Sequence, residues 1–229
     1  VTAQPPVSAQ EIPLLATKLY IPPPRPGLVP RPRLIERLNE GLMHKLTLIS
    51  APAGFGKTTL LAAWLASLGE ATPPIPSAWL QVDAEASDPV VFANHLLAAV
   101  QTRYPKVGGK LLVRLREASP PPLPDLARSL LNELDQIESP FVLVLDDYHT
   151  IREQSVRELL AELLRHPPEG MQLVLVTRRD LLLPLAQLRA KGLVTEIRTE
   201  DLRFTTAEAA ALLQQWIETP VDESTISLL

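Results

Sequence analysis

The chain alternates between short apolar runs and segments in which apolar residues recur every three or four positions. The short runs predict the strands of a buried sheet. They cover residues 46–50, 77–83, 141–147, 171–177 and 194–198. The other segments predict helices that turn one apolar face toward the sheet. They cover residues 31–42, 57–68, 89–103, 107–118, 125–137, 153–165, 183–191 and 206–217.

Strands and helices therefore follow one another in turn, which predicts an α/β fold. We expect a three-layer sandwich in which a mostly parallel five-stranded sheet carries helices on both faces. Asp88, followed by Pro89, and Asp125 are the expected N-caps of two of the helices. Ligands of such sheets bind at the carboxyl ends of the strands. The residues that directly follow the strands are therefore the first candidates for a functional site.

The first predicted strand runs into a glycine-bearing turn and then into a helix, through the residues Ala51-Pro52-Ala53-Gly54-Phe55-Gly56-Lys57-Thr58-Thr59. This order is typical of the P-loop, in which a turn and a helix N-terminus wrap a nucleotide triphosphate. Ala51 stands where the strict pattern has its first glycine. The alternative is a plain glycine-rich turn between a strand and a helix. The strand before and the helix after the turn favour the P-loop, and we expect the fold of a P-loop NTPase that binds ATP or GTP.

Each chemical requirement of a phosphate site has a candidate in this turn. Gly54 and Gly56 let the backbone bend and approach the phosphates without a Cβ. Lys57 can bridge the outer phosphates, which makes it a catalytic candidate, and the Thr58 hydroxyl can bind Mg²⁺. We therefore predict nucleotide contacts from Ala53, Gly54, Phe55, Gly56, Lys57, Thr58 and Thr59.

Two acids end one of the later predicted strands, and two arginines follow another. Asp146 is expected to hold Mg²⁺ through a water, and Asp147 to orient or deprotonate the water that attacks the γ-phosphate. A strand that simply ends in a polar turn is the alternative for both acids. Arg178 could sense the γ-phosphate, whereas a solvated turn is the stronger alternative for its neighbour Arg179. His149 is expected to be a loop residue rather than a catalyst.

Charge and composition narrow the range of partners. The net charge is −4 and no block of consecutive Lys or Arg occurs, so we do not expect direct nucleic-acid binding by these residues. Cysteine is absent, which excludes disulfides and thiolate metal sites. No apolar run approaches the roughly 18 residues of a transmembrane helix. We expect a soluble cytoplasmic protein with no membrane partner.

The two ends of the chain suggest a piece of a longer protein. The first residue is Val1 rather than Met, and residues 221–229 stop in an apolar run without a cap or breaker. Residues 1–27 are expected to be a proline-rich leader that lies on the domain or is loose. Residues 28–218 are expected to form the nucleotide-binding domain, and residues 219–229 to begin a following, truncated helical domain.

Several stretches occur together, in an order that resembles one known family. They are Thr17-Lys18-Leu19-Tyr20-Ile21-Pro22, Leu28-Val29-Pro30-Arg31-Pro32-Arg33-Leu34, the P-loop, Leu145-Asp146-Asp147-Tyr148-His149, Thr177-Arg178-Arg179-Asp180 and Asp201-Leu202-Arg203-Phe204. Together they resemble the N-terminal ATPase domain of the MalT-like large ATP-binding regulators of the LuxR family. These are bacterial STAND-class signalling ATPases. The resemblance covers about residues 14 to 217.

This resemblance implies further roles. Val29 and Arg31 would pack on the adenine and ribose, with Val29 backbone groups reading the base edge. ADP would hold a closed resting monomer, and an inducer would permit its exchange for ATP. The ATP form would self-associate, so that a C-terminal DNA-binding domain absent from these residues engages promoters.

The main hypothesis is therefore a nucleotide-dependent switch that binds Mg·ATP or ADP and hydrolyses ATP slowly, with a change of assembly as its output. The alternative is a P-loop motor or kinase with rapid turnover. A third possibility is a degenerate module that binds nucleotide only for structure. Steady-state hydrolysis separates the three.

Overall fold

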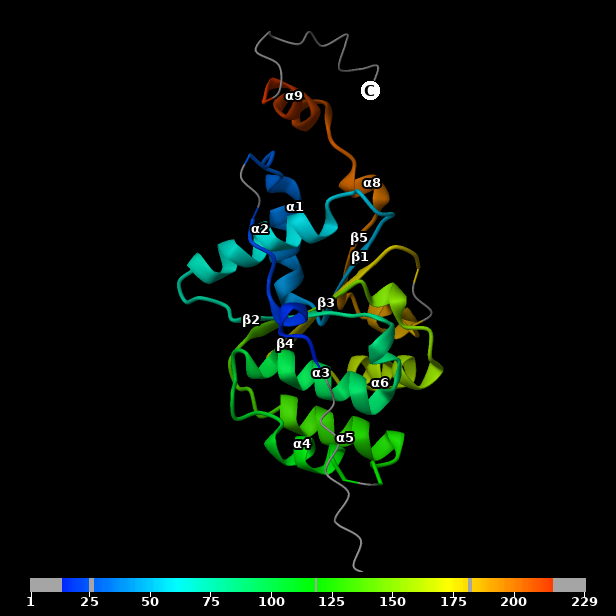
Figure 1. Cartoon of the computed structure of the whole chain (residues 1–229). Helices are drawn as coiled ribbons and strands as arrows, with labels where there is room; N and C mark the ends of the chain where they lie inside the picture. The colour runs from blue at the N-terminus through cyan, green and yellow to red at the C-terminus, as the bar shows by residue number, and fades with distance from the viewer. Residues whose placement is uncertain (1–13, 25–26, 118, 181–182, 216–229) are drawn as a thin grey trace, which may run out of the picture.

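The computed structural model describes residues 14–24, 27–117, 119–180 and 183–215 (Figure 1). Its centre is a parallel sheet in the order β2-β3-β4-β1-β5. The strands are β1 (Leu46–Ser50), β2 (Ser77–Gln81), β3 (Phe141–Asp146), β4 (Met171–Thr177) and β5 (Val194–Ile197). The α/β architecture with a five-stranded sheet is confirmed, and every strand pair of the described residues is parallel.

Helices cover both faces of this sheet, as predicted (Figure 1). On one face lie α1 (Pro32–Glu40) and α2 (Lys57–Glu70). On the other lie α3 (Pro89–Gln101), α4 (Gly109–Leu115), α5 (Leu123–Leu134), α6 (Gln154–Arg165) and the short α7 (Ala186–Ala190). The chain then continues through α8 (Thr199–Leu202) and α9 (Thr206–Gln214). Short 3-10 turns lie at Ala16–Leu19, Gly41–Met43, Ala84–Ser87 and Tyr148–Thr150.

Two helix starts test the predicted caps. The Asp88 carboxylate accepts hydrogen bonds from the Val90 and Val91 amides at 2.8 and 3.1 Å, and Pro89 is the first residue of α3. That cap is confirmed. The predicted cap at Asp125 is wrong, because α5 begins two residues earlier at Leu123 and carries Asp125 in its first turn. Proline suits the first turn of a helix, where its missing N–H costs no hydrogen bond.

Alternate residues of each strand face the two helical layers. In β3, Phe141, Leu143 and Leu145 pack into the core under α3 to α6, whereas Val142 and Val144 face α1 and α2. Successive side chains of a strand point to opposite faces. Because both faces are covered, the predicted strands contain continuous apolar runs. Trp64 and Trp79 are buried in the α1–α2 core, while Trp216 lies outside the described residues.

Strand register brings the predicted site together at one edge of the sheet. Ser50 at the end of β1 lies opposite Thr177 at the end of β4, and Gln81 at the end of β2 lies opposite Asp146. Since β4 lies between β1 and β3, the loops that follow these three strands are neighbours.

The described part of the leader lies on the domain. Its 3-10 turn, Ala16–Leu19, contacts β2. Lys18 is only 8% exposed, and its Nζ lies 2.5 Å from Asp83 and 2.7 Å from Glu85, both in the segment after β2. The ion pairs attach residues 16–19 to the carboxyl edge of the sheet.

Candidate functional site

The turn between β1 and α2 depends on two glycines with left-handed backbones. Gly54 has φ 87° and Gly56 has φ 73°, a region that L side chains rarely adopt. A Cβ added at either position would meet no atom within 4 Å. Backbone conformation, rather than crowding, therefore requires glycine at both positions. Gly56 is the N-cap of α2, so the turn ends at the positive end of a helix.

Ala51 explains how the pattern can lack its first glycine. Its amide donates to the Thr177 carbonyl at 3.3 Å, which continues the pairing of β1 with β4 by one residue. Among the described residues, Asp147 is the non-glycine residue with positive φ, so Ala51 has no left-handed backbone. An alanine methyl is therefore compatible with the start of this turn, and Ala51 is buried at 2% exposure.

Lys57 is the first residue of α2 and reaches back over the turn. Its Nζ donates to the Ala51 and Pro52 carbonyls, at 2.7 Å each. Burial and the nearby Arg178 charge lower the pKa of Lys57, and the carboxylates of Asp146 and Asp147 partly offset them. The turn thus encloses a cation at its base, as a binding site for polyphosphate requires.

Thr58 and Asp146 meet across the site, although they are 88 positions apart in sequence. The Thr58 hydroxyl donates to Asp146 Oδ2 at 3.0 Å, and the Asp147 amide donates to Asp146 Oδ1 at 2.9 Å. Asp146 is 4% exposed; burial and the Asp147 charge raise the pKa of its carboxyl, while the two hydrogen bonds oppose that rise. A hydroxyl and a carboxylate are hard oxygen ligands of the kind that Mg²⁺ prefers. Thr58 and Asp146 are therefore the residues that would hold it.

Asp147 and Arg178 also lie together. Asp147 takes a left-handed backbone, with φ 56°, directly after β3. Its Oδ1 lies 3.4 Å from Arg178 Nη2, one residue after β4. Arg179 instead donates to the His149 carbonyl at 3.1 Å. The sheet thus brings both predicted catalytic side chains to the edge that carries the P-loop.

A groove of about 1430 Å³ opens beside this turn. Its walls are three segments distant in sequence: residues 27–36, residues 53–67 around the start of α2, and residues 202–213. The lining includes most of the predicted nucleotide-binding residues, namely Val29, Arg31, Ala53, Gly54, Phe55, Gly56 and Thr59. A mostly apolar groove next to a phosphate loop is suited to a base and ribose.

Residues 32–176 match the family described as the AAA ATPase domain. The chain belongs to this family. It is also 31% identical over 216 residues to the HTH-type transcriptional regulator MalT of Yersinia enterocolitica and 32% identical to that of Serratia proteamaculans. Each alignment covers 94% of this chain and 23% of the relative. The resemblance to MalT-like regulators is confirmed, and the chain spans about a quarter of the length of these relatives.

Solved structures agree with the AAA assignment at the level of the fold. A Walker-type ATPase of Pyrococcus abyssi matches with a TM-score of 0.54 and 16% identity, over 90% of this chain and 64% of that one. Orc1 of Aeropyrum pernix, solved in complex with DNA, matches with a TM-score of 0.51 and 19% identity, over 80% of this chain and 47% of that one. The P-loop NTPase fold predicted from the sequence is therefore confirmed.

Arg31 of this AAA domain lines the groove but makes its contacts with the far wall. Its Nη2 donates to the Leu202 and Arg203 carbonyls at 2.8 and 2.9 Å, and its guanidinium lies 4.8 Å from the centre of the Phe204 ring. Burial lowers the pKa of Arg31, which the Glu208 charge partly offsets. In the described structure Arg31 thus holds residues 202–204 in place. Its contact with adenine or ribose stays a prediction.

No local sequence pattern predicts the third wall of the groove. Residues 201–204 stand out in the sequence only through the family resemblance, and α8, four residues long, is not among the predicted helices. No local spacing links this segment to the P-loop about 150 residues earlier. One signal was available: Phe204 is an aromatic residue beside polar neighbours, and it is 48% exposed at the groove.

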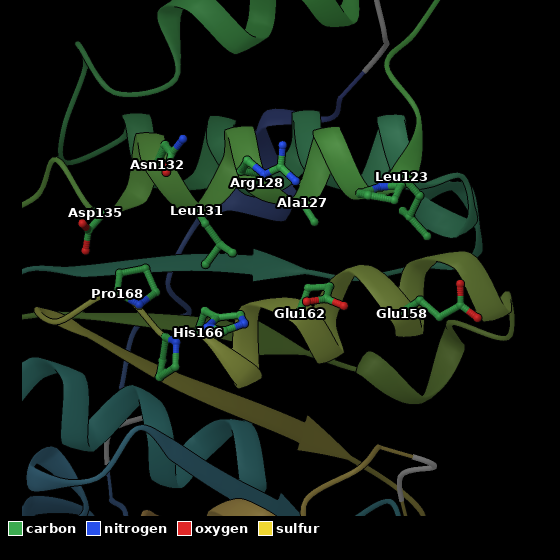
Figure 2. Close-up of a pocket in the computed structure, with 12 residues that line it drawn as sticks. Leu123, Ala127, Arg128, Leu131, Asn132, Asp135, Glu158, Glu162, His166 and Pro168 are labelled. Atoms are coloured by element: carbon green, nitrogen blue, oxygen red, sulfur yellow. The ribbon is translucent and has the colours of Figure 1, made fainter.

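A second groove, of about 650 Å³, lies between α5 and α6 on the other face of the sheet. Figure 2 shows Leu123 and Leu131 of α5 opposite Glu158 and Glu162 of α6, with His166 at one end. None of the predicted site residues lines it. The geometry therefore favours the groove beside the P-loop as the nucleotide site. Within the described residues, no helix is both long enough and apolar enough to cross a membrane.

Proposed function

We propose that this AAA domain is a nucleotide-dependent switch in a signal-responsive bacterial transcription activator of the STAND class. It binds Mg·ATP or ADP and hydrolyses ATP slowly, and the bound nucleotide controls self-association of the longer, cytoplasmic protein. The AAA family match and the similarity to HTH-type regulators support this reading.

The hydrogen bond between Thr58 and Asp146 carries the proposal. A hydroxyl at the start of the P-loop helix and a carboxylate at the end of β3 lie 3.0 Å apart, next to an open groove. Bound Mg²⁺ would supply positive charge to the phosphate oxygens. Thr58 would hold it directly and Asp146 through a water, while Lys57 would contact the outer phosphates.

Asp147 and Arg178 are the residues proposed to respond to the γ-phosphate. Asp147 would accept a proton from the attacking water, and Arg178 would contact the γ-phosphate oxygens. Their own contact, at 3.4 Å, supports a switch, because Arg178 would exchange one anionic partner for another when ATP replaces ADP. A ligand shifts the equilibrium between two conformations only if its interactions with the protein differ between them.

DNA binding is assigned to another part of the protein. This chain has a net charge of −4 and covers 23% of the regulators that it resembles. A separate C-terminal helix-turn-helix domain would contact promoters, in keeping with the name of those relatives, HTH-type transcriptional regulators. The described residues would thus control assembly rather than read DNA.

The affinity of the Lys57→Ala variant for nucleotide tests the proposal. Calorimetric titration with Mg·ATP should show affinity reduced roughly 10- to 100-fold, because a hydrogen bond to a charged group contributes about 1.5–3 kcal/mol. Lys110→Ala is the matched control: it removes an exposed lysine from α4, on the opposite face of the sheet. Unchanged affinity in the folded Lys57→Ala protein would refute the assignment of the site.

Steady-state hydrolysis distinguishes the switch from its alternatives. Slow, magnesium-dependent turnover without any inducer supports the switch. A motor or kinase is expected to turn over at roughly 1 to 10³ per second. A degenerate module would show no magnesium-dependent hydrolysis and no response to Asp147→Asn.

A further inference from the structure

Two side chains approach the same oxygen of Asp147. Arg178 Nη2 lies 3.4 Å from Asp147 Oδ1, and His149 Nδ1 lies 3.6 Å from that oxygen. The left-handed backbone of Asp147 turns the chain back on itself after β3, so that the 3-10 turn at Tyr148–Thr150 brings His149 beside the carboxylate. Non-glycine residues in this conformation concentrate at functional sites, where surrounding contacts hold them.

The turn that carries His149 is anchored on both sides. The His149 carbonyl accepts a hydrogen bond from Arg179 Nη2 at 3.1 Å. The Thr150 amide and hydroxyl both donate to the Asp147 carbonyl, at 3.0 Å each. The imidazole is therefore presented to Asp147 by backbone contacts that do not involve its ring.

The imidazole nitrogen that faces Asp147 has no hydrogen-bond partner of its own in the described structure. The His149 side chain is 15% exposed, and Nδ1 is buried. Burial lowers the pKa of His149; Asp147 opposes this, and the charges of Arg178, Arg179 and Lys57 reinforce it. The lowered pKa favours the uncharged form of the ring. A neutral ring with its proton on Nδ1 can donate a hydrogen bond to the Asp147 carboxylate. It does so without neutralising the negative charge that lets this carboxylate act as a general base.

Binding of the γ-phosphate would affect Arg178 and His149 differently. Arg178 is a cation, so a newly arrived phosphate competes with Asp147 for it. A neutral His149 has no such attraction to phosphate. When Arg178 turns to the nucleotide, His149 is the described side chain that remains beside Asp147 Oδ1.

We propose that His149 is a positioning residue for ATP hydrolysis, which holds Asp147 Oδ1 through Nδ1–H and so directs Oδ2 toward the attacking water. This rests on the proposed function. In the step itself, Asp147 Oδ2 takes a proton from the water, and the water oxygen bonds to the γ-phosphorus. The bond from that phosphorus to the bridging oxygen breaks with its electron pair on ADP, and inorganic phosphate leaves.

Three substitutions of His149 test the inference. They place a hydrogen-bond donor near one ring nitrogen, near the other, or near neither. His149→Asn puts an amide nitrogen near the place of Nδ1, His149→Gln puts it near Nε2, and His149→Ala removes both. Hydrolysis of labelled ATP under single-turnover and steady-state conditions gives kcat, and calorimetry gives the Kd for Mg·ATP. His166→Ala is the control, since His166 is exposed at the end of α6 in the α5–α6 groove (Figure 2).

We expect His149→Ala and His149→Gln to lower kcat at least about tenfold with Kd unchanged, because misplacing a catalytic group costs of that order or more. His149→Asn should keep kcat within about threefold of the starting protein, and so should His166→Ala. A purely structural role predicts that the Asn and Gln variants, which differ by one methylene, lose activity equally. That result, or full activity in His149→Ala, overturns the inference.

The comparison of Asn with Gln also decides the outcome if the Ala variant fails to fold. Failure of the proposed function has a different signature: the unsubstituted protein would not bind Mg·ATP, or would bind it and never hydrolyse it. Either result would remove the role of His149 together with the proposed function.

Discussion

Arg33 and Glu208 lie 175 positions apart and meet through two hydrogen bonds, Nε to Oε1 at 3.1 Å and Nη2 to Oε2 at 3.0 Å. Two neighbouring arginines, one on each side of Arg33 in the sequence, extend this contact. Arg31 Nη2 lies 3.4 Å from Glu208 Oε2, and Arg37 Nη1 lies 2.5 Å from Asp201 Oδ1. This arginine clamp, formed by Arg31, Arg33 and Arg37, holds residues 201–208 against α1 and closes one side of the groove.

Glu208→Gln should weaken the clamp and lower the stability of the domain. The substitution removes the charge that Arg31 and Arg33 share, and a hydrogen bond to a charged group contributes about 2 kcal/mol. For a domain of this size that corresponds to a fall in Tm of roughly 4–8 °C. Differential scanning calorimetry gives the value. Glu117→Gln, at an exposed acid after α4, should shift Tm by less than about 2 °C.

The effect of Glu208→Gln should disappear in acid. Burial opposes ionisation of Glu208, but hydrogen bonds from Arg33 and the Thr205 amide, with the Arg31 charge, hold its pKa below the ordinary 4.5. A carboxyl with a lowered folded-state pKa adds stability that is present above the unfolded pKa and lost as pH falls through the folded one. The Tm difference should be complete above about pH 4.5 and vanish below the lowered pKa. A difference that is independent of pH would contradict this electrostatic origin.

Gly56→Ala and Gly69→Ala should have opposite effects, although both lie at ends of α2. Gly56 has φ 73°, and an L side chain in that region costs roughly 1–2 kcal/mol. Its replacement should also reduce ATP affinity, because the N–H groups of the turn would shift. Gly69 is exposed in the last turn of α2, and alanine there should stabilise by about 0.5–1 kcal/mol. Urea unfolding and calorimetric titration measure both effects.

Asp147→Asn should separate binding from hydrolysis. Asparagine adopts the left-handed backbone about as readily as aspartate, so the turn after β3 should keep its shape. Loss of the general base should reduce kcat by about 10² or more, while the Kd for Mg·ATP stays within a few fold. Asp146→Asn is the informative contrast, because removing a proposed Mg²⁺ partner should weaken the magnesium dependence of binding itself. Equal rates of hydrolysis before and after Asp147→Asn would exclude Asp147 as the base.

Lys18→Met should loosen the attachment of residues 16–19. The methionine keeps an apolar stem of similar length but loses the ion pairs with Asp83 and Glu85, at 2.5 and 2.7 Å. Asp83 is partly exposed and Glu85 largely exposed, so we expect a cost of only about 1–2 kcal/mol. Hydrogen exchange of the residue 16–19 amides should accelerate, while that of β3 stays unchanged. Lys106→Met, at an exposed lysine after α3, should leave both unchanged.

The sequence alone located the five strands because a parallel sheet covered on both faces needs continuous apolar runs. The P-loop, Asp146 at the end of β3 and Asp147 directly after it could also be predicted, since left-handed glycines, a helix start and a strand end are local features. The Asp125 cap failed for a local reason too, because Pro124 allows α5 to start before it. The predicted strand over residues 77–83 ran two residues too long, because Asp83 caps the following 3-10 turn instead.

Only the tertiary structure decided which distant side chains meet. The contacts of Arg33 with Glu208, and of Arg178 with Asp147, follow from how β5 and β4 lie beside β1 and β3, which no short-range pattern records. The approach of His149 to Asp147 depends on one backbone angle of a non-glycine residue. Local patterns determine where a chain forms strands and turns, whereas the pairing of surfaces depends on the packing of all the elements at once.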